Sequence, residues 1–511
     1  MTDWRFDFHP QPTMPPLAWV AVVQPGLAAV HHGASVRTAG AAFFEGTWAG
    51  PSDLSALPEA TTVFGTGMVT RGDQLIAIPP SHHLECLYVA RVSEVHLGDA
   101  LVVSNSLPGL LAATGLELDP HADYSKVFLG AVKAVWLIDE PRDGELRLRH
   151  QRFEIPTKTN PITGWYVENL VIRPNLSIGT RRRPREAPFA SFADYKSRLT
   201  AATASLIANG RPYEPVVSLS GGYDSAAVAA VAGAAGTTRA VGFETARPVR
   251  HADDADSGAR TAAALGLEFV ARDRLAYLAR SDLTEADLLA SGMAGEDLIF
   301  LGLEPEIRRS IFLHGYWAGT EFAFHDRHAW QHVSPITTSG ADFTEFRLRS
   351  DFFNVPLPVF GAIRTSDAPN LLDRAEMDPY RVGGKYDRPI PRRLAEEAGV
   401  RRGTFAVTKR AANVLPPREG MAAFTPAARE SITRFAATQG GHAECRTRRP
   451  FSRYERGLLR AAQRLHLSPL AHALGRRQAS LAHFEPRLGN LLFRWAVSVV
   501  AERYEQIERA Y

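Results

Sequence analysis

The sequence predicts an α/β protein in which a β-rich domain precedes a larger domain built on a parallel sheet. Residues 1–180 hold short runs of branched, alternating residues interrupted by Gly, Pro, Asp and Asn, a pattern typical of strands and tight turns. Residues 181–188 are charged and contain proline, as exposed linkers do. From residue 189 strand and helix patterns alternate, which indicates βαβ units. We therefore expect domains at 1–180 and 189–511.

The length and composition agree with two domains and indicate an ordinary soluble globular protein. The chain has 511 residues, more than one hydrophobic core ordinarily holds. Its hydrophobic content of 45% and charged content of 22% are those of an ordinary soluble globular protein. A net charge of +3 is small for this length and argues against nucleic acid as a partner.

The cysteines and the apolar segments bear on the compartment. Cys86 and Cys445 are far apart and form no CxxC, which favours a reducing, cytoplasmic environment. The first residues carry an acid and prolines and lack the apolar segment of a signal peptide. Residues 491–500 come closest to a membrane span but are too short and contain Arg494. We interpret them as a packed terminal helix and expect no membrane partner.

Individual elements follow from local patterns. In the first domain strands are expected over 17–23, 85–97, 99–106, 134–138 and 146–155. In the second, helices are expected over 191–210, 225–236 and 254–266, and strands over 215–220, 239–245 and 267–273. Ser191 is the expected N-cap of the first of these helices, with Asp194 three residues on. From about residue 280 helical patterns dominate.

The stretch "VVSLSGGYDSAAVAAVAG", residues 216–233, places two glycines, an acid and hydroxyls between a strand and a helix. Parallel sheets bind ligands at the carboxyl ends of strands, and glycines let the backbone approach a ligand closely. A helix N-terminus favours anions, and Ser220 and Ser225 can donate hydrogen bonds to phosphate oxygens. Asp224 would repel phosphate unless it carries Mg²⁺, which prefers carboxylate and phosphate oxygens. The corner therefore predicts a site for nucleotide phosphates, although it matches neither the Walker pattern nor GxGxxG.

This Ser-Gly-Gly-x-Asp-Ser sequence resembles the signature of the PP-loop, or N-type, ATP pyrophosphatases. The resemblance implies an adenine-nucleotide α-hydrolase-like fold for 189–511, with ATP and Mg²⁺ as cofactors. Members of the family cleave ATP to AMP and pyrophosphate, adenylating an oxygen of the substrate before a nucleophile displaces AMP. The resemblance implies the following nucleotide-binding residues: Ser218, Leu219, Ser220, Gly221, Gly222, Asp224, Ser225, Phe243 and Gly315.

The place of the motif, behind a β-rich domain, is similar to that in asparagine synthetase and its relatives, which include β-lactam synthetase and the lasso-peptide cyclases. Residues 251–269, 344–358 and 385–412 resemble further segments of that group. The resemblance covers roughly residues 190–415. It implies that 1–180 is a glutaminase-like domain.

The resemblance also implies catalytic residues. Lys409 matches a lysine of the amide-forming step and would stabilise the tetrahedral intermediate and the departing phosphate, while Glu345 or Tyr386 would help to take the proton from the amine. Plain structural interpretations stand beside these roles. Lys409 fits a solvated basic face, Glu345 fits an ion pair with an arginine, and "RPIPRR", 388–393, fits either a structural loop or a contact for a carboxylate-bearing substrate.

Two features depart from the family pattern. The family's GxGxDE loop carries a second Mg²⁺-binding acid, and the nearest stretch here, 313–326, offers Glu321 as that metal ligand, with Asp326 as its rival. Thr2 stands where glutamine-dependent asparagine synthetases have a nucleophilic cysteine. We therefore expect the first domain to be a degenerate glutaminase-like scaffold.

The sequence thus predicts an ATP-dependent, AMP-forming carbon–nitrogen ligase that works without glutamine hydrolysis, in a biosynthetic pathway such as lasso-peptide macrocyclisation. Its partners would be a carboxylate- and amine-bearing substrate and, in the lasso case, a precursor peptide and its leader protease. Two alternatives remain open. One is an amidotransferase that uses ammonia on a small molecule, and the other is a non-catalytic ATP-binding scaffold in a biosynthetic complex.

Overall fold

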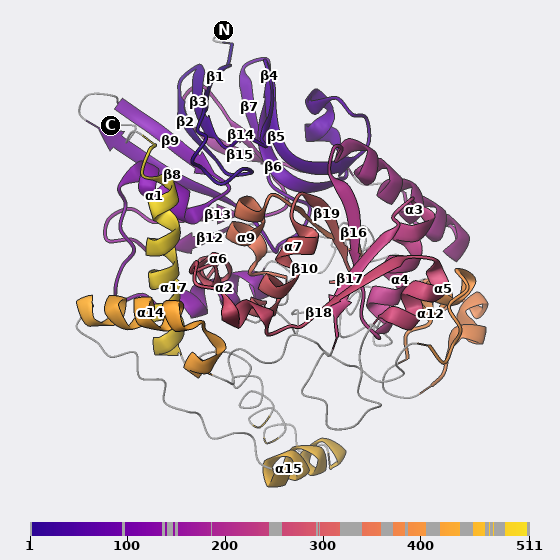
Figure 1. Cartoon of the computed structure of the whole chain (residues 1–511). Coiled ribbons are helices and arrows are strands. Elements are labelled where there is room, and N and C mark those ends of the chain that lie inside the picture. The colour runs from indigo at the N-terminus through magenta and orange to yellow at the C-terminus, as the bar shows by residue number, and fades with distance from the viewer. Residues whose placement is uncertain are drawn as a thin grey trace.

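The computed structural model is a mixed α/β protein, which confirms the predicted class (Figure 1). Largely antiparallel sheets occupy the chain up to residue 181, and a parallel sheet follows them. The structure describes residues 3–94, 98–134, 138–139, 147–148, 152–184, 187–244, 258–292, 295, 297–316, 340–358, 371–383, 387–404, 420–439, 453–465, 470, 474 and 486–507.

The first part of the chain holds two facing sheets. The seven-stranded sheet has the order β1-β3-β2-β9-β8-β13-β12 and the six-stranded sheet the order β15-β14-β7-β6-β5-β4. Their strands are β1 (Arg5–Pro10), β2 (Trp19–Gln24), β3 (Leu27–His32), β4 (Arg37–Ala39), β5 (Ala42–Ala49), β6 (Thr62–Arg71), β7 (Gln74–Ile78), β8 (Leu87–Glu94), β9 (Gly98–Ser104), β12 (Arg152–Ile155), β13 (Ile162–Trp165), β14 (Asn169–Ile172) and β15 (Ile178–Arg181). Only β1 and β3 pair in parallel among the described strands of these sheets, and a separate ribbon joins β10 (Ile138–Asp139) to β11 (Arg147–Leu148).

Both faces of the central strands are buried, and alternation assigns their side chains to different cores. In β2, Trp19, Ala21 and Val23 enter the core between the two sheets. Val20 and Val22 point the other way, into a core that continues toward the second half of the chain. The side chains of β8 and β9 also alternate between these two cores. Because successive strand residues face opposite sides, a strand covered on both sides needs a continuous apolar run.

The second part of the chain is built on five parallel strands in the order β18-β17-β16-β19-β20. They are β16 (Glu214–Ser218), β17 (Arg239–Phe243), β18 (Glu268–Arg272), β19 (Ser310–His314) and β20 (Phe353–Pro356). The chain moves outward from β16 through α4 (Tyr223–Ala234) and α5 (Ala259–Leu265) to β18, then returns to place β19 on the other side of β16. The strand order therefore reverses between β16 and β19.

Several of the described helices pack against these sheets. The α-helices not yet named are α1 (Leu107–Thr114), α2 (Tyr124–Ala134), α3 (Phe192–Asn209), α6 (Glu285–Leu289), α7 (Glu304–Ile307), α9 (Phe343–Ser350), α12 (Pro389–Glu397), α14 (Pro426–Thr438), α15 (Arg453–Arg464) and α17 (Pro486–Ala501). The short 3₁₀ helices used below are η1 (Leu54–Glu59), η6 (Ala375–Tyr380) and η8 (Glu502–Tyr504). As predicted, α3 begins after Ser191, whose side chain accepts a hydrogen bond from the Asp194 backbone N–H.

Two sequence predictions need correction. The strand expected over 134–138 is wrong at its start, because Ala134 ends helix α2 and only Ile138 belongs to a strand. The buried residues Tyr124, Phe128 and Ala131 recur at helical spacing, a stronger signal than the branched residues that follow. The helices expected after residue 280 include two strands, β19 and β20, which are short buried runs that periodicity alone cannot assign.

One apolar core extends from the outer face of the seven-stranded sheet to the parallel sheet. Helix α17 belongs to it, and the Phe493 ring lies 4.9 Å from the Tyr124 ring and 5.3 Å from the Phe128 ring of α2. The segment 491–500 is thus the packed helix that the sequence predicts. Among the described residues no helix is long and apolar enough to cross a membrane. The division at 181–188 stays a prediction.

A buried ionic network also joins the sandwich to the parallel-sheet part. Arg347 of α9 is 1% exposed and its guanidinium pairs with Glu45 of β5, with Nη1 2.6 Å from Oε2. Its Nε donates to Glu85, which precedes β8. Asn354 of β20 donates to Glu85 over 2.8 Å, and His314, at the end of β19, bonds the Asn354 amide oxygen over 2.7 Å. Burial lowers the pKa of His314 to about 4, so the ring is neutral.

Removing the Arg347 guanidinium should destabilise the whole protein. Arg347→Ala leaves two buried carboxylates without their counter-ion, and we expect a loss of about 3–5 kcal/mol in the free energy of unfolding. Urea unfolding followed by intrinsic fluorescence measures it. The control is Arg434→Ala, which removes an exposed pair with Glu430 and should change the stability by less than about 0.5 kcal/mol. Equal effects of the two substitutions would contradict the assignment.

Candidate functional site

The Ser-Gly-Gly-Tyr-Asp-Ser corner lies at the carboxyl end of β16, beside the point where the strand order reverses. Open parallel sheets bind ligands in the crevice at such a point. Leu219 extends β16 by donating its backbone N–H to Val241 of β17 over 2.8 Å, and its side chain is buried. Gly222 is the N-cap of α4 and, as a glycine, has no side chain that could cap the helix. The positive end of the α4 dipole therefore lies at this corner.

Three glycines allow the backbone to pack closely around this corner. A Cβ on Gly242 of β17 would come within 2.2 Å of the Leu219 carbonyl oxygen, and one on Gly258 within 2.5 Å of the Leu219 side chain. Gly315 follows β19, and a Cβ there would lie 3.0 Å from the Asp224 carbonyl carbon. The corner is thus fixed by its neighbours on both sides, as a site that must approach phosphates closely requires.

The two predicted hydroxyls bond to each other in this structure. Ser220 Oγ and Ser225 Oγ are 2.9 Å apart, and Ser225 Oγ also accepts the Ser220 backbone N–H over 3.1 Å. The Gly222 backbone N–H donates to Ser220 Oγ over 3.3 Å. Ser220 and Ser225 thus lie together at the corner. They hold the turn closed, and a bound phosphate would have to replace some of these contacts.

The carboxylate of Asp224 is paired with Arg388, the residue before α12. Arg388 Nη1 lies 2.9 Å from Oδ1 and 3.1 Å from Oδ2 of Asp224. Arg388 is 5% exposed, whereas the Asp224 side chain is 27% exposed. Arg388 is a site residue that sequence reasoning missed, because "RPIPRR" was expected to be a structural loop or a substrate contact. An arginine beside a predicted metal-binding acid has no local sequence signal.

The rest of "RPIPRR" has a structural role. The fully buried Arg392 of α12 donates Nη2 to the Tyr223 hydroxyl over 3.0 Å, and its guanidinium lies 5.0 Å from the centre of that ring. It also pairs with Asp387 over 3.1 Å. Arg393 pairs with Glu376 and Glu397. These contacts hold α12 against the first turn of α4 and so position Arg388.

The remaining predicted nucleotide residues lie at the same sheet edge. Ser218 ends β16, and Phe243 ends the adjacent strand β17, where its ring contacts Phe300 edge-on at 5.7 Å. The predicted residues Lys409, Tyr386, Glu321, Asp326 and Thr2 lie outside the described residues. Among the residues that the structure does describe, no three His, Cys, Asp or Glu side chains gather as a metal site.

Glu345, a predicted catalytic residue, belongs to a different cluster. It is 2% exposed in α9, and it accepts hydrogen bonds from Ser106 Oγ at the start of α1 (3.1 Å) and from the Tyr504 hydroxyl in η8 (3.3 Å). Burial raises the pKa of Glu345 to about 8, and the nearby charge of Asp287 adds to this rise. The structural interpretation of Glu345 was an ion pair with an arginine. The nearby arginines Arg347 and Arg349 pair with other acids instead, Glu45 and Asp287.

The predicted linker is only partly a solvated connector. Arg183 donates Nε to the Val167 carbonyl over 2.9 Å and further bonds to the carbonyls of Ala60 and Pro79. Burial lowers the pKa of Arg183 to about 10. Arg183 therefore binds this segment to the sandwich by donating hydrogen bonds to backbone carbonyls.

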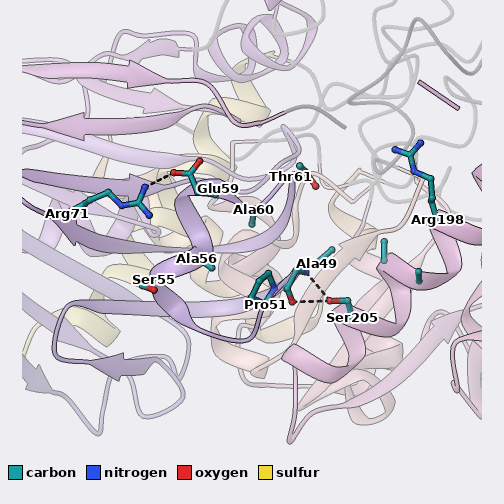
Figure 2. A pocket seen from close by; sticks show the side chains of 13 residues that line it. Ala49, Pro51, Ser55, Ala56, Glu59, Ala60, Thr61, Arg71, Arg198 and Ser205 are labelled. Atoms are coloured by element: carbon teal, nitrogen blue, oxygen red, sulfur yellow. Dashed lines mark hydrogen bonds and ion pairs between the residues drawn. The ribbon is translucent and has the colours of Figure 1, made fainter. Parts of the chain in front are cut away.

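An open groove of about 690 Å³ lies away from the corner, between η1, the end of β5 and α3 (Figure 2). Small residues such as Ala49, Ala56 and Ser205 line it, with Glu59 and Arg71 paired at one end. No residue of the described corner lines this groove. The candidate site is thus identified by its chemistry and topology rather than by hollow volume.

Comparison of the chain with protein-family models and with curated proteins finds no match in either case.

The close packing around the corner can be tested at Gly242. Gly242→Ala forces a Cβ against the Leu219 carbonyl, and we expect a loss of about 1–3 kcal/mol in unfolding free energy, measured by urea titration. Gly403→Ala is the matched control, because its Cβ would meet nothing within 4 Å, and it should change the stability by less than about 0.5 kcal/mol. A neutral Gly242→Ala would show that the corner is not fixed as described.

The raised pKa of Glu345 makes stability depend on pH. The unfolded carboxyl ionises near pH 4.5, whereas the buried one ionises at about 8, so its contribution is full below 4.5 and is lost as pH rises to about 8. Relative to Glu345→Gln, the wild-type protein should lose up to about 1.4 kcal/mol per pH unit between pH 5 and 8. Parallel urea titrations across this range measure the difference. A constant difference would mean that Glu345 is ionised in the folded protein throughout.

Proposed function

We propose that the chain is an ATP-dependent, AMP-forming carbon–nitrogen ligase that adenylates a substrate carboxylate, releases pyrophosphate and passes the acyl group to an amine. The observation that supports this best is the place of the Ser-Gly-Gly-Tyr-Asp-Ser corner in the parallel sheet. Its hydroxyls, the N-terminus of α4 and the Asp224 carboxylate lie together where the strand order reverses. A site for metal-bound phosphates requires a carboxylate, and Asp224 supplies one in the corner sequence.

The residues of the corner fit ATP and Mg²⁺ by their chemistry. Backbone N–H groups at the start of α4, with Ser220 and Ser225, would bind phosphate oxygens, and Asp224 would hold Mg²⁺ with Glu321 as the proposed second acid. The chemistry that Mg²⁺ supplies when bound is stabilisation of the negative charge on pyrophosphate as it leaves. A side chain at Gly315 would press against the backbone of Asp224 and Ser225, so glycine lets this segment approach the start of α4 closely.

Roles in the second step remain part of the proposal. Lys409 is the proposed cation that stabilises the tetrahedral intermediate, and Tyr386 is the proposed partner for the amine proton. Glu345 is less suited to that task, because Ser106 and Tyr504 occupy its carboxyl oxygen. A peptide macrocyclisation of the lasso type, with a precursor peptide and its protease, is one form that the reaction would take in the cytoplasm. Amidation of a small molecule with ammonia is another.

One observation favours a second candidate, a nucleotide-binding scaffold without catalysis. Arg388 pairs with the Asp224 carboxylate, which in this arrangement is not open to a metal ion. If that pair were permanent, the corner would hold phosphates but not the metal needed to cleave ATP.

ATP–pyrophosphate exchange with candidate carboxylates separates the two functions. For the ligase we expect exchange and AMP formation in the wild-type protein, and at least about a 100-fold loss of both in Asp224→Ala, because the metal and phosphate charge are no longer balanced. Glu430→Ala, an exposed acid on α14, is the control and should keep full activity. AMP formation that survives Asp224→Ala would remove the corner from the mechanism, and tight ATP binding without exchange would favour the scaffold.

A further inference from the structure

The pairing of Asp224 with Arg388 raises a question about how a metal ion reaches this carboxylate. One guanidinium nitrogen of Arg388 contacts both carboxylate oxygens, at 2.9 and 3.1 Å. These are the oxygens that would coordinate Mg²⁺. The metal and the arginine therefore compete for the same atoms.

Arg388 is built into its place rather than reaching the carboxylate by chance. It stands at the start of α12, where its carbonyl accepts the Arg392 backbone N–H over 3.2 Å. Arg392 is fully buried and anchors α12 to Tyr223, the residue directly before Asp224. The Arg388 side chain is 6% exposed, so its charge cannot simply turn out into water. Losing the carboxylate would remove a counter-charge from a buried guanidinium and so favour the binding of another anion close by.

We propose that Arg388 is a phosphate-binding residue that neutralises Asp224 in the nucleotide-free protein and passes to a phosphate oxygen when Asp224 takes up the metal. This inference rests on the proposed function, since it concerns the same site. It assigns to Arg388 a role in ligand selection: the site accepts a metal ion and a polyphosphate together, and binds either of them alone weakly.

The charges explain why the two ligands depend on each other. A metal ion alone would bring a second cation beside Arg388, and the metal, the Asp224 carboxylate and the guanidinium would together carry a charge of +2. A polyphosphate alone would meet the Asp224 carboxylate while Arg388 is still engaged with it. When both bind, the metal neutralises Asp224 and the phosphates supply a new anion for Arg388.

The Arg388 side chain suits both partners chemically. Its Nη1 contacts both Asp224 carboxylate oxygens, at 2.9 and 3.1 Å. A guanidinium carries its N–H groups in a fixed fork, and this fork also suits two oxygens of one phosphate.

Binding of free Mn²⁺, used as a probe of the metal alone, tests the first half of the proposal. The full-length wild-type protein should bind Mn²⁺ weakly at this site in the absence of nucleotide, as measured by electron paramagnetic resonance. Arg388→Gln removes the competing cation and should tighten Mn²⁺ binding about 10-fold or more. Arg402→Gln is the matched control, since it removes an exposed arginine that pairs with Glu396 outside the corner, and it should change nothing.

Binding of inorganic pyrophosphate, measured by calorimetry, tests the second half. With Mn²⁺ present, Arg388→Gln should weaken pyrophosphate binding about 10-fold or more, the reverse of its effect on free Mn²⁺. Without metal, Asp224→Asn releases Arg388 and should tighten pyrophosphate binding about 10-fold. The double variant Asp224→Asn with Arg388→Gln should lose most of that gain, which separates a contribution of Arg388 from mere removal of the Asp224 charge.

Several results would overturn the proposal. Unchanged Mn²⁺ and Mn²⁺–pyrophosphate affinities in Arg388→Gln would show that the arginine has only a structural role, and a double variant as tight as Asp224→Asn would show the same. Arg388→Lys, which keeps the charge, guards against misfolding and should stay within about threefold of the wild-type Mn²⁺ affinity. If the wild-type protein binds neither ATP nor pyrophosphate with metal, the proposed function itself fails. If ATP and pyrophosphate bind with metal but Arg388→Gln has no effect, only this inference fails.

Discussion

The structure depends on one buried cation, the guanidinium of Arg347. Two carboxylates of the β-sandwich, Glu45 and Glu85, have been taken out of water and are stable only while this arginine from α9 lies between them. Glu85 also holds Asn354, which orients His314 at the end of β19. The next residue is Gly315, whose backbone packs against the start of α4. A continuous set of polar contacts thus relates the crevice to the sandwich, so the two parts cannot be positioned independently.

A second arginine from a distant part of the chain balances an acid at the carboxyl end of the parallel sheet. Asp224 lies in a corner whose glycines leave no room for side chains, and its charge is balanced by an arginine that α12 supplies from far along the sequence. Arg347 and Arg388 differ in one respect. The carboxylates around Arg347 are almost fully buried, whereas Asp224 is 27% exposed in its side chain and borders the crevice. The first pair is therefore structural, whereas we propose that Asp224 exchanges its arginine for a metal ion.

Much of this architecture could be predicted from local patterns, and what could not be predicted has two causes. The corner is recognisable because glycines, hydroxyls and an acid at a strand-to-helix junction constrain each other within a few residues. Strands β19 and β20 were missed because short, fully buried runs carry no periodicity. The contacts of Arg388 and Glu345 could not be predicted for another reason. Their partners, Asp224 and Ser106, lie more than a hundred residues away, and only the folded topology brings them together.

The packing of α17 has a consequence for how the chain is made. Its Phe493 completes the cover over Tyr124 and Phe128, and Tyr504 just after it contacts the start of α1 at Gly109. At ordinary rates of translation these residues leave the ribosome tens of seconds after α2 does. During that interval an apolar face of the sandwich is exposed to other molecules in the cell. The nascent chain should therefore depend on chaperones that shield this face, and a fragment that stops before residue 486 should aggregate rather than fold.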